Sequence, residues 1–137
     1  MLNLIYEIRD PIHGFIKFNA LERAIIDSKP FQRLRYIKQL AFTDYVYPGA
    51  IHTRFAHSLG VMEFATKIFN ILLQNPAHID LLKSSLNWND EERMQNLQLL
   101  RLGALLHDVG HAPFSHAAEF LFKNGQNHED YSEKIIL

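Results

Sequence analysis

The stretch Leu105-Leu106-His107-Asp108-Val109-Gly110-His111 is where a strongly apolar pattern ends abruptly in ionisable side chains. Apolar residues recur at helical spacing before it, and Asp90 is suited to cap that helix, which predicts one helix running from Asp90 toward Gly110. Ionisable groups cost free energy to bury unless they are paired or bound to a metal. The stretch therefore predicts a core helix whose last turn carries a His–Asp pair with a specific task.

Two explanations fit the His107–Asp108 pair taken alone. In the first, a neutral imidazole and a carboxylate ligate a divalent ion, with Mn, Fe, Ni, Mg and Zn all admissible. In the second, His107 caps the helix C-terminus and Asp108 pairs with a nearby arginine. The isolated dipeptide favours the second explanation, because short motifs give many false positives.

A second polar group occurs in the segment HTRFAHSLG, residues 52–60. Arg54 and His57 are three residues apart and therefore share one face of a helix. The guanidinium offers a planar fork for phosphate oxygens, and a neutral imidazole beside it remains able to ligate a metal. Taken alone, however, this pair also fits a surface arginine next to a histidine at the edge of the core.

The pattern along the chain predicts a mainly α fold with a small N-terminal β-hairpin. Alternation and the DPIHG turn place the hairpin in residues 2–18. Asn19 and Glu22 form a predicted capping box for the first short helix. The further predicted helices run from Pro30 through Leu40, from about residue 51 to Asn75-Pro76, from Pro113 through Leu121 to Asn124-Gly125, and from Asn127 onward, whereas residues 78–89 are ambiguous.

Length and composition suit one domain, since the chain has 137 residues of which 47% are hydrophobic. The net charge of −1 disfavours strong nucleic-acid binding. The chain has no cysteine, which leaves imidazole and carboxylate as the strong metal ligands and suits a cytoplasmic location. No apolar segment indicates export or membrane insertion.

The last predicted helix begins at Asn127 and reaches only Leu137. Its apolar face, formed by Tyr131, Ile135 and Ile136, has no later segment to pack against. We therefore expect residues 1–137 to be a single, C-terminally incomplete domain, with the hairpin in residues 1–18 and the helical core in residues 19–137.

Five segments in order resemble one known family far more specifically than any His–Asp pair does. The order of His57 and His107–Asp108 resembles the HD-domain phosphohydrolases. More narrowly, the segments resemble the deoxynucleoside triphosphate triphosphohydrolases of that superfamily, including the SAM-and-HD-domain type. The segments are DPIHG (10–14), FQRLRYIKQL (31–40), YPGA (47–50), HTRFAHSLGV (52–61) and HDVGHAPFSH (107–116).

The resemblance implies an HD-domain helical bundle in which His57, His107 and Asp108 ligate a divalent metal ion. The fourth ligand of the family, a downstream Asp, has no counterpart, because the later acids Glu119, Glu129, Asp130 and Glu133 lie too close. We therefore expect weak metal binding and little turnover from these 137 residues alone. A divalent cation would lower the pKa of bound water and neutralise phosphate charge, so that attack at the α-phosphorus releases deoxynucleoside and triphosphate.

The resemblance also implies roles around the metal. Arg54, His111, His116 and His128 match residues lining the triphosphate and the reaction centre, and Gln39 and Leu40 match positions beside the sugar. Asp27, Gln32 and Arg35 match a regulatory nucleotide site found in some members.

Helical spacing lets Glu119 orient His116, which we expect to be the general acid, although a surface histidine with an ion-pair neighbour also fits. His128 and Glu129 are either a second acid–base pair or polar residues of a first helical turn.

Hydrolysis of deoxynucleoside triphosphates, in a homo-oligomer, is the leading functional prediction. The enzymatic alternative is another HD phosphohydrolase, acting on nucleotide phosphomonoesters or cyclic nucleotides. The non-enzymatic alternative is an inactive truncated module that binds nucleotide or a partner through its exposed apolar face. Product identity separates the first two, since only the first releases intact triphosphate.

Overall fold

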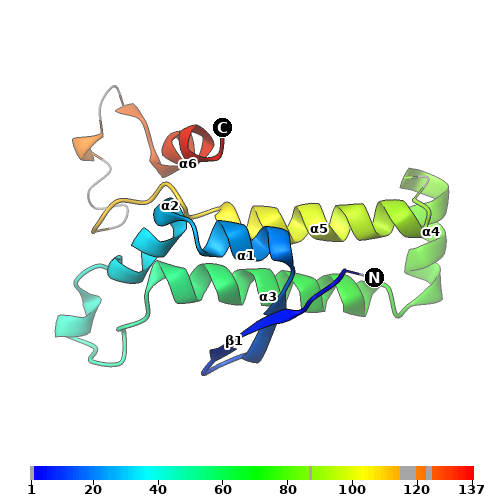
Figure 1. Ribbon diagram of the computed structural model, residues 1–137, viewed down its shortest axis with the longest axis horizontal. Coiled ribbons are helices and arrows are strands. Elements are labelled where there is room, and N and C mark those ends of the chain that lie inside the picture. Colours follow the sequence, from blue (N-terminus) through cyan, green and yellow to red (C-terminus); the bar gives the residue numbers. More distant parts are fainter. Residues whose placement is uncertain (1, 87, 115–119, 123–124) are drawn as a thin grey trace.

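The computed structural model describes residues 2–86, 88–114, 120–122 and 125–137, and it confirms the mainly helical architecture with a small antiparallel sheet (Figure 1). Strand β1 (Tyr6–Asp10) pairs with β2 (Gly14–Phe18) in a register that sets Asp10 opposite Gly14. The Asp10 carboxylate accepts two backbone N–H groups of the turn at 2.9 Å, and Gly14 takes a φ of +77°. Both features are typical of a locally encoded turn, which explains why the hairpin was predictable.

Helix α1 (Ala20–Ile26) follows the hairpin directly. The predicted capping box is confirmed: the Asn19 side chain accepts the Glu22 N–H, and the Glu22 carboxylate accepts the Asn19 N–H, both at 2.9 Å. The cap satisfies donors that the first helical turn leaves without partners.

The helix predicted from Pro30 through Leu40 is wrong in its second half. Helix α2 (Lys29–Gln32) passes into a 3₁₀ turn, η1 (Arg33–Tyr36), and Ile37 is then extended with φ −109° and ψ 111°. The Ile37 carbonyl accepts the backbone N–H of Arg54 at 2.8 Å. Backbone pairing with the chain just before the next helix thus replaces a continued helix. A second 3₁₀ turn, η2 (Thr43–Tyr45), lies in the connection.

Three helices follow, and the first and third of them lie side by side along the length of the molecule (Figure 1). Helix α3 (Arg54–Leu72) begins slightly later than predicted, because Thr53 caps it by accepting the Ala56 N–H. The ambiguous stretch contains α4 (Pro76–Leu86). Helix α5 (Asp90–Leu106) is capped by Asn89, so the prediction that Asp90 is the cap is wrong by one residue.

The prediction of a helix opening at Pro113 is wrong at its start. Phe114 has a φ of +71°, in the left-handed region that a right-handed helix excludes. Residues 115–119 and 123–124 of this predicted helix lie outside the described residues, and Phe120 and Leu121 form a short 3₁₀ turn. The final helix, α6 (His128–Ile136), begins as predicted, with Asn127 in a capping box with Asp130.

The core joins the hairpin to the paired helices, with buried side chains from β2, α2, η1, α3 and α5. A fully buried ion pair ties α5 to α1 and, through further hydrogen bonds, to α3 and β2. Arg101 on α5 donates to both carboxylate oxygens of Glu22 at 2.7 and 2.9 Å, to Thr66 Oγ1 at 2.7 Å and to the Lys17 carbonyl at 2.8 Å. In the part of the chain that the structure describes, no helix is both long and apolar enough to cross a membrane.

Candidate metal centre

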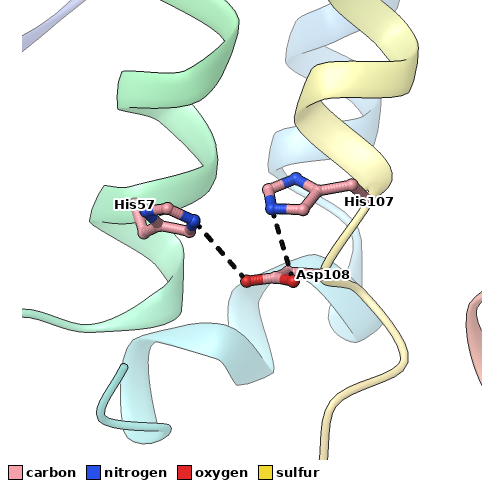
Figure 2. Close-up of side chains that lie close together, drawn as sticks. All are labelled: His57, His107 and Asp108. Atoms are coloured by element: carbon pink, nitrogen blue, oxygen red, sulfur yellow. Dashed lines mark ion pairs between the residues drawn. The ribbon is translucent and has the colours of Figure 1, made fainter. Parts of the chain in front are cut away.

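The side chains of His57, His107 and Asp108 meet where the first turns of α3 face the end of α5 (Figure 2). The Asp108 carboxylate lies between the two imidazoles. Its Oδ2 is 3.8 Å from His57 Nε2, and its Oδ1 is 3.3 Å from His107 Nε2. One ligand atom from each of the three residues lies within 4.8 Å of the other two, an arrangement that could hold a metal ion.

The backbone orients the His107 ring. Its Nδ1 lies 2.8 Å from the Ala104 carbonyl oxygen, which can only accept a hydrogen bond. Nδ1 can therefore donate to this carbonyl, which leaves Nε2 facing the Asp108 carboxylate. Metal-binding histidines commonly have their second nitrogen held in this way.

Asp108 is a buried carboxylate surrounded by positive or polar groups. Arg54, which is 2% exposed, donates from Nη1 to Asp108 Oδ2. Burial raises the pKa of Asp108, but His107 and Arg54 outweigh this effect and hold the pKa below its ordinary value. The carboxylate is therefore ionised at neutral pH, as a metal ligand must be.

His57 is held in the form that a metal needs. Burial lowers the pKa of its imidazole; Asp108 opposes this shift, whereas His107 and Arg54 add to it. The imidazole is therefore neutral at neutral pH. Two imidazoles and one carboxylate suit a divalent transition ion, so the donor set fits a metal.

Two of the predicted reaction-centre histidines, His111 and His128, lie near the same carboxylate. His111 is 1% exposed, and its Nε2 lies 3.6 Å from Asp108 Oδ1. The His128 ring stacks on the His111 ring at 3.8 Å between centroids. Asp108, His111 and His128 form a second group of side chains that could hold a metal. Glu129 is exposed in the first turn of α6, and His116 and Glu119 lie outside the described residues.

The remaining predicted residues lie on the segment before α3. Gln39 donates its N–H to the His52 carbonyl at 3.0 Å, and Leu40 beside it is 45% exposed. Gln32 and Arg35 come together, since Arg35 Nε donates to Gln32 Oε1 at 2.7 Å. Asp27 instead pairs with Arg23 at 3.3 Å, so the structure joins two of the three predicted regulatory residues and not the third.

Two residues that the sequence did not single out hold the turn that carries Asp108. Ser132 Oγ accepts the Gly110 N–H at 2.9 Å. Arg33 donates to the carbonyls of Val109 and His111, each at 2.7 Å. Nothing in the local sequence distinguishes Arg33 from its neighbours Arg35 and Lys38, because its partners lie 76 and 78 residues away.

A cleft of about 520 Å³ opens beside the metal centre, lined by the hairpin turn, the loop before α3 and the first turns of α3. His13 and His52 join His57 in its wall, and the rest of the lining is largely apolar, including Ile12, Val61 and Phe64. A ligand reaching His57 from this side would meet an apolar surface.

Comparison with known proteins relates the chain to one family. The HD domain model matches residues 54–137. The deoxynucleoside triphosphate triphosphohydrolase SAMHD1 of Bos taurus is 41% identical over 120 residues, covering 85% of this chain and 18% of that protein. An uncharacterised protein of Methanocaldococcus jannaschii is 43% identical over 129 residues, covering 94% of this chain and 23% of that protein.

A solved structure of a hypothetical protein from Aquifex aeolicus is similar with a TM-score of 0.69 and 38% identity, covering 99% of this chain and 31% of that one. The chain thus spans between 18% and 31% of the length of these relatives. The HD domain match covers more than half of the chain and includes His57 and the His107–Asp108 pair. The resemblance predicted from the sequence is confirmed, and the chain belongs to the HD domain family.

Proposed function

We propose that this chain supplies most of the metal centre of a phosphohydrolase that converts deoxynucleoside triphosphates to deoxynucleoside and inorganic triphosphate. The observation that carries the proposal is the convergence of His57, His107 and Asp108, whose ligand atoms lie within 4.8 Å of one another. The similarity to SAMHD1, whose name states this activity, supports the choice of substrate.

His57, His107 and Asp108 would hold the ion, with Mn, Fe, Ni, Mg and Zn all compatible with the donors. The ion supplies neutralisation of phosphate charge and a lowered pKa for bound water. Arg54, fixed against the Asp108 carboxylate, adds a permanent positive charge beside that site. A polyanionic substrate is thereby favoured over a neutral one.

Proton transfer to the leaving 5′-oxygen requires an imidazole near the ion. His111 and His128 support this role, since their stacked rings lie against Asp108. His116, oriented by Glu119, remains our proposed general acid, and Glu129 beside His128 a proposed partner in proton transfer. Gln39 and Leu40 are proposed to contact the sugar.

A regulatory nucleotide site at Gln32 and Arg35, with Asp27, is a further part of the proposal. The hydrogen bond between Arg35 and Gln32 supports two of its members. We also propose that residues 1–137 belong to one domain, and that the protein is a cytoplasmic homo-oligomer without strong affinity for nucleic acids.

The test incubates the full-length protein with each deoxynucleoside triphosphate and Mn²⁺ or Mg²⁺, and resolves the products by anion exchange. His107→Ala is the inactivating variant. His78→Ala is the matched control, because His78 is exposed on α4 and contacts the Leu72 carbonyl. Triphosphate and deoxynucleoside from the wild type and His78→Ala, but not from His107→Ala, are expected.

Other products would assign a different activity to the protein. Release of phosphate or pyrophosphate, or turnover of phosphomonoesters or cyclic nucleotides alone, would indicate another HD phosphohydrolase. Absence of turnover with every metal and nucleotide would contradict the proposal and favour a binding module.

A further inference from the structure

We infer that Arg33 is a positioning residue for the metal centre, because it holds the turn that carries Asp108 in register with the start of α3. The inference deepens the proposed function and rests on it. Arg33 lies in η1, far from His107 and Asp108 in the sequence, and it ligates nothing itself. Arg33 instead binds the backbone of the turn that follows Asp108.

The contact is a two-pronged hydrogen bond. Arg33 Nη1 donates to the His111 carbonyl and Nη2 to the Val109 carbonyl, each at 2.7 Å. These two carbonyls flank Gly110, just after the end of α5. Both carbonyls belong to the turn beyond the helix, where no helical hydrogen bond is available to them, and a backbone carbonyl removed from water needs a donor. Arg33 therefore satisfies two acceptors of this turn.

Arginine suits this position for a geometric reason. The guanidinium presents two parallel donors in a rigid plane, so it can fix the separation of two carbonyls. Arg33 is half-buried, which lowers the pKa of its guanidinium, yet an arginine remains charged. A lysine at this position would supply a point charge without the planar fork.

The same short segment also contacts the other half of the site. Four residues after Arg33, the Ile37 carbonyl accepts the Arg54 N–H at 2.8 Å, at the first residue of α3. His57 lies in the next turn of that helix. The segment from Arg33 to Ile37 thus bonds to the turn of Asp108 on one side and to the helix of His57 on the other, and so helps to set their separation.

Other bonds to the turn do not replace this one. Ser132 Oγ accepts the Gly110 N–H at 2.9 Å, and it lies 3.4 Å from the His107 carbonyl. These contacts tie the turn to α6, which bears none of the three proposed ligands. Arg33 and Arg54, by contrast, connect the turn to the segments around the start of α3: Arg33 donates to its backbone and Arg54 to the Asp108 carboxylate.

The first test measures Mn²⁺ affinity of the full-length protein by electron paramagnetic resonance. Arg33→Met is expected to weaken binding about 10- to 100-fold, the range typical of residues that support metal ligands. Arg33→Lys is expected to restore only part of it, because it lacks the fork. Leu97→Ala is the matched control, since it opens a cavity in α5 away from the turn and lowers stability without touching the centre.

The second test needs no metal. Hydrogen exchange of the His111 amide, which donates to the Asp108 carbonyl at 3.1 Å, should accelerate in Arg33→Met and not in Leu97→Ala at matched global stability. Unchanged exchange in both Arg33 variants, or equal loss of Mn²⁺ affinity in Leu97→Ala, would overturn the inference. If the wild type binds no Mn²⁺, the proposed function fails, while the exchange result still decides whether Arg33 holds the turn.

Discussion

The Arg54 guanidinium donates to the Asp108 carboxylate across 54 residues of sequence, and both side chains are almost completely buried. This ion pair joins the first residue of α3 to the turn after α5, so it lies at the junction of the two halves of the candidate metal centre. Together with His107, Arg54 holds the pKa of the Asp108 carboxyl below its ordinary value, although burial raises it.

Replacing Arg54 with Met should destabilise the fold by about 3–5 kcal/mol, because removal of one partner leaves a buried charge uncompensated. A bound divalent cation would supply the missing positive charge. Mn²⁺ should therefore raise the thermal midpoint of Arg54→Met more than that of the wild type, as measured by calorimetry. Equal shifts would contradict a shared role of Arg54 and the ion at Asp108.

Gly110 is where α6 approaches the turn most closely. An added Cβ would lie 2.1 Å from the His128 carbonyl oxygen and 2.3 Å from the Ser132 nitrogen, and backbone cannot move aside cheaply. Gly110→Ala should lower the free energy of unfolding by about 3 kcal/mol or more, measured in urea. Gly103→Ala is the control: nothing lies within 4 Å of its added Cβ, and in a helix it should stabilise by about 0.5–1 kcal/mol.

Ala41 has a φ of +49°, in the left-handed region that costs an L-residue roughly 1–2 kcal/mol. Ala41→Gly should therefore stabilise the protein by about 0.5–1 kcal/mol, after the greater backbone entropy of glycine is subtracted. Ala65→Gly, within α3, should instead destabilise it by about 1 kcal/mol. Loss of stability in both variants would show that the Ala41 backbone is not strained.

The fold was predictable where its causes are local. The Asp10 turn, the Asn19 capping box and the Asn127 cap each act over three residues, so the sequence alone indicates them. The end of the helix after Pro30 was not predictable, because Ile37 is extended by pairing with Arg54, 17 residues later. Periodicity alone continues such a helix, since it carries no information on distant backbone partners.

The candidate site also contains residues that the sequence identified and one that it did not. His57, His107 and Asp108 were identifiable because their side-chain chemistry and order are distinctive. Arg33 was not, because an arginine in an amphipathic pattern is indistinguishable from a solvated charge until its acceptors are known. A residue that positions the ligands is thus harder to identify from the sequence than the ligands themselves.

The buried pair of Glu22 and Arg101 should make stability depend on pH in acid. Burial raises the pKa of Glu22, but hydrogen bonds from Arg101 and the Asn19 backbone outweigh it and hold the pKa below its ordinary value of 4.5. A carboxyl whose pKa is lower when folded contributes stability that is fully present above its unfolded value. That contribution is lost as the pH falls below 4.5 and through the folded value.

Glu22→Gln should therefore lower stability at pH 7 and flatten its decline below pH 4.5, as urea unfolding at a series of pH values would measure. Glu91→Gln is the control, because Glu91 is an exposed carboxyl near the start of the same helix as Arg101. Its decline in acid should follow that of the wild type. An unchanged acid slope in Glu22→Gln would mean that the pair titrates alike in the folded and unfolded chains, and that Arg101 is held by its bonds to Thr66 and the Lys17 carbonyl instead.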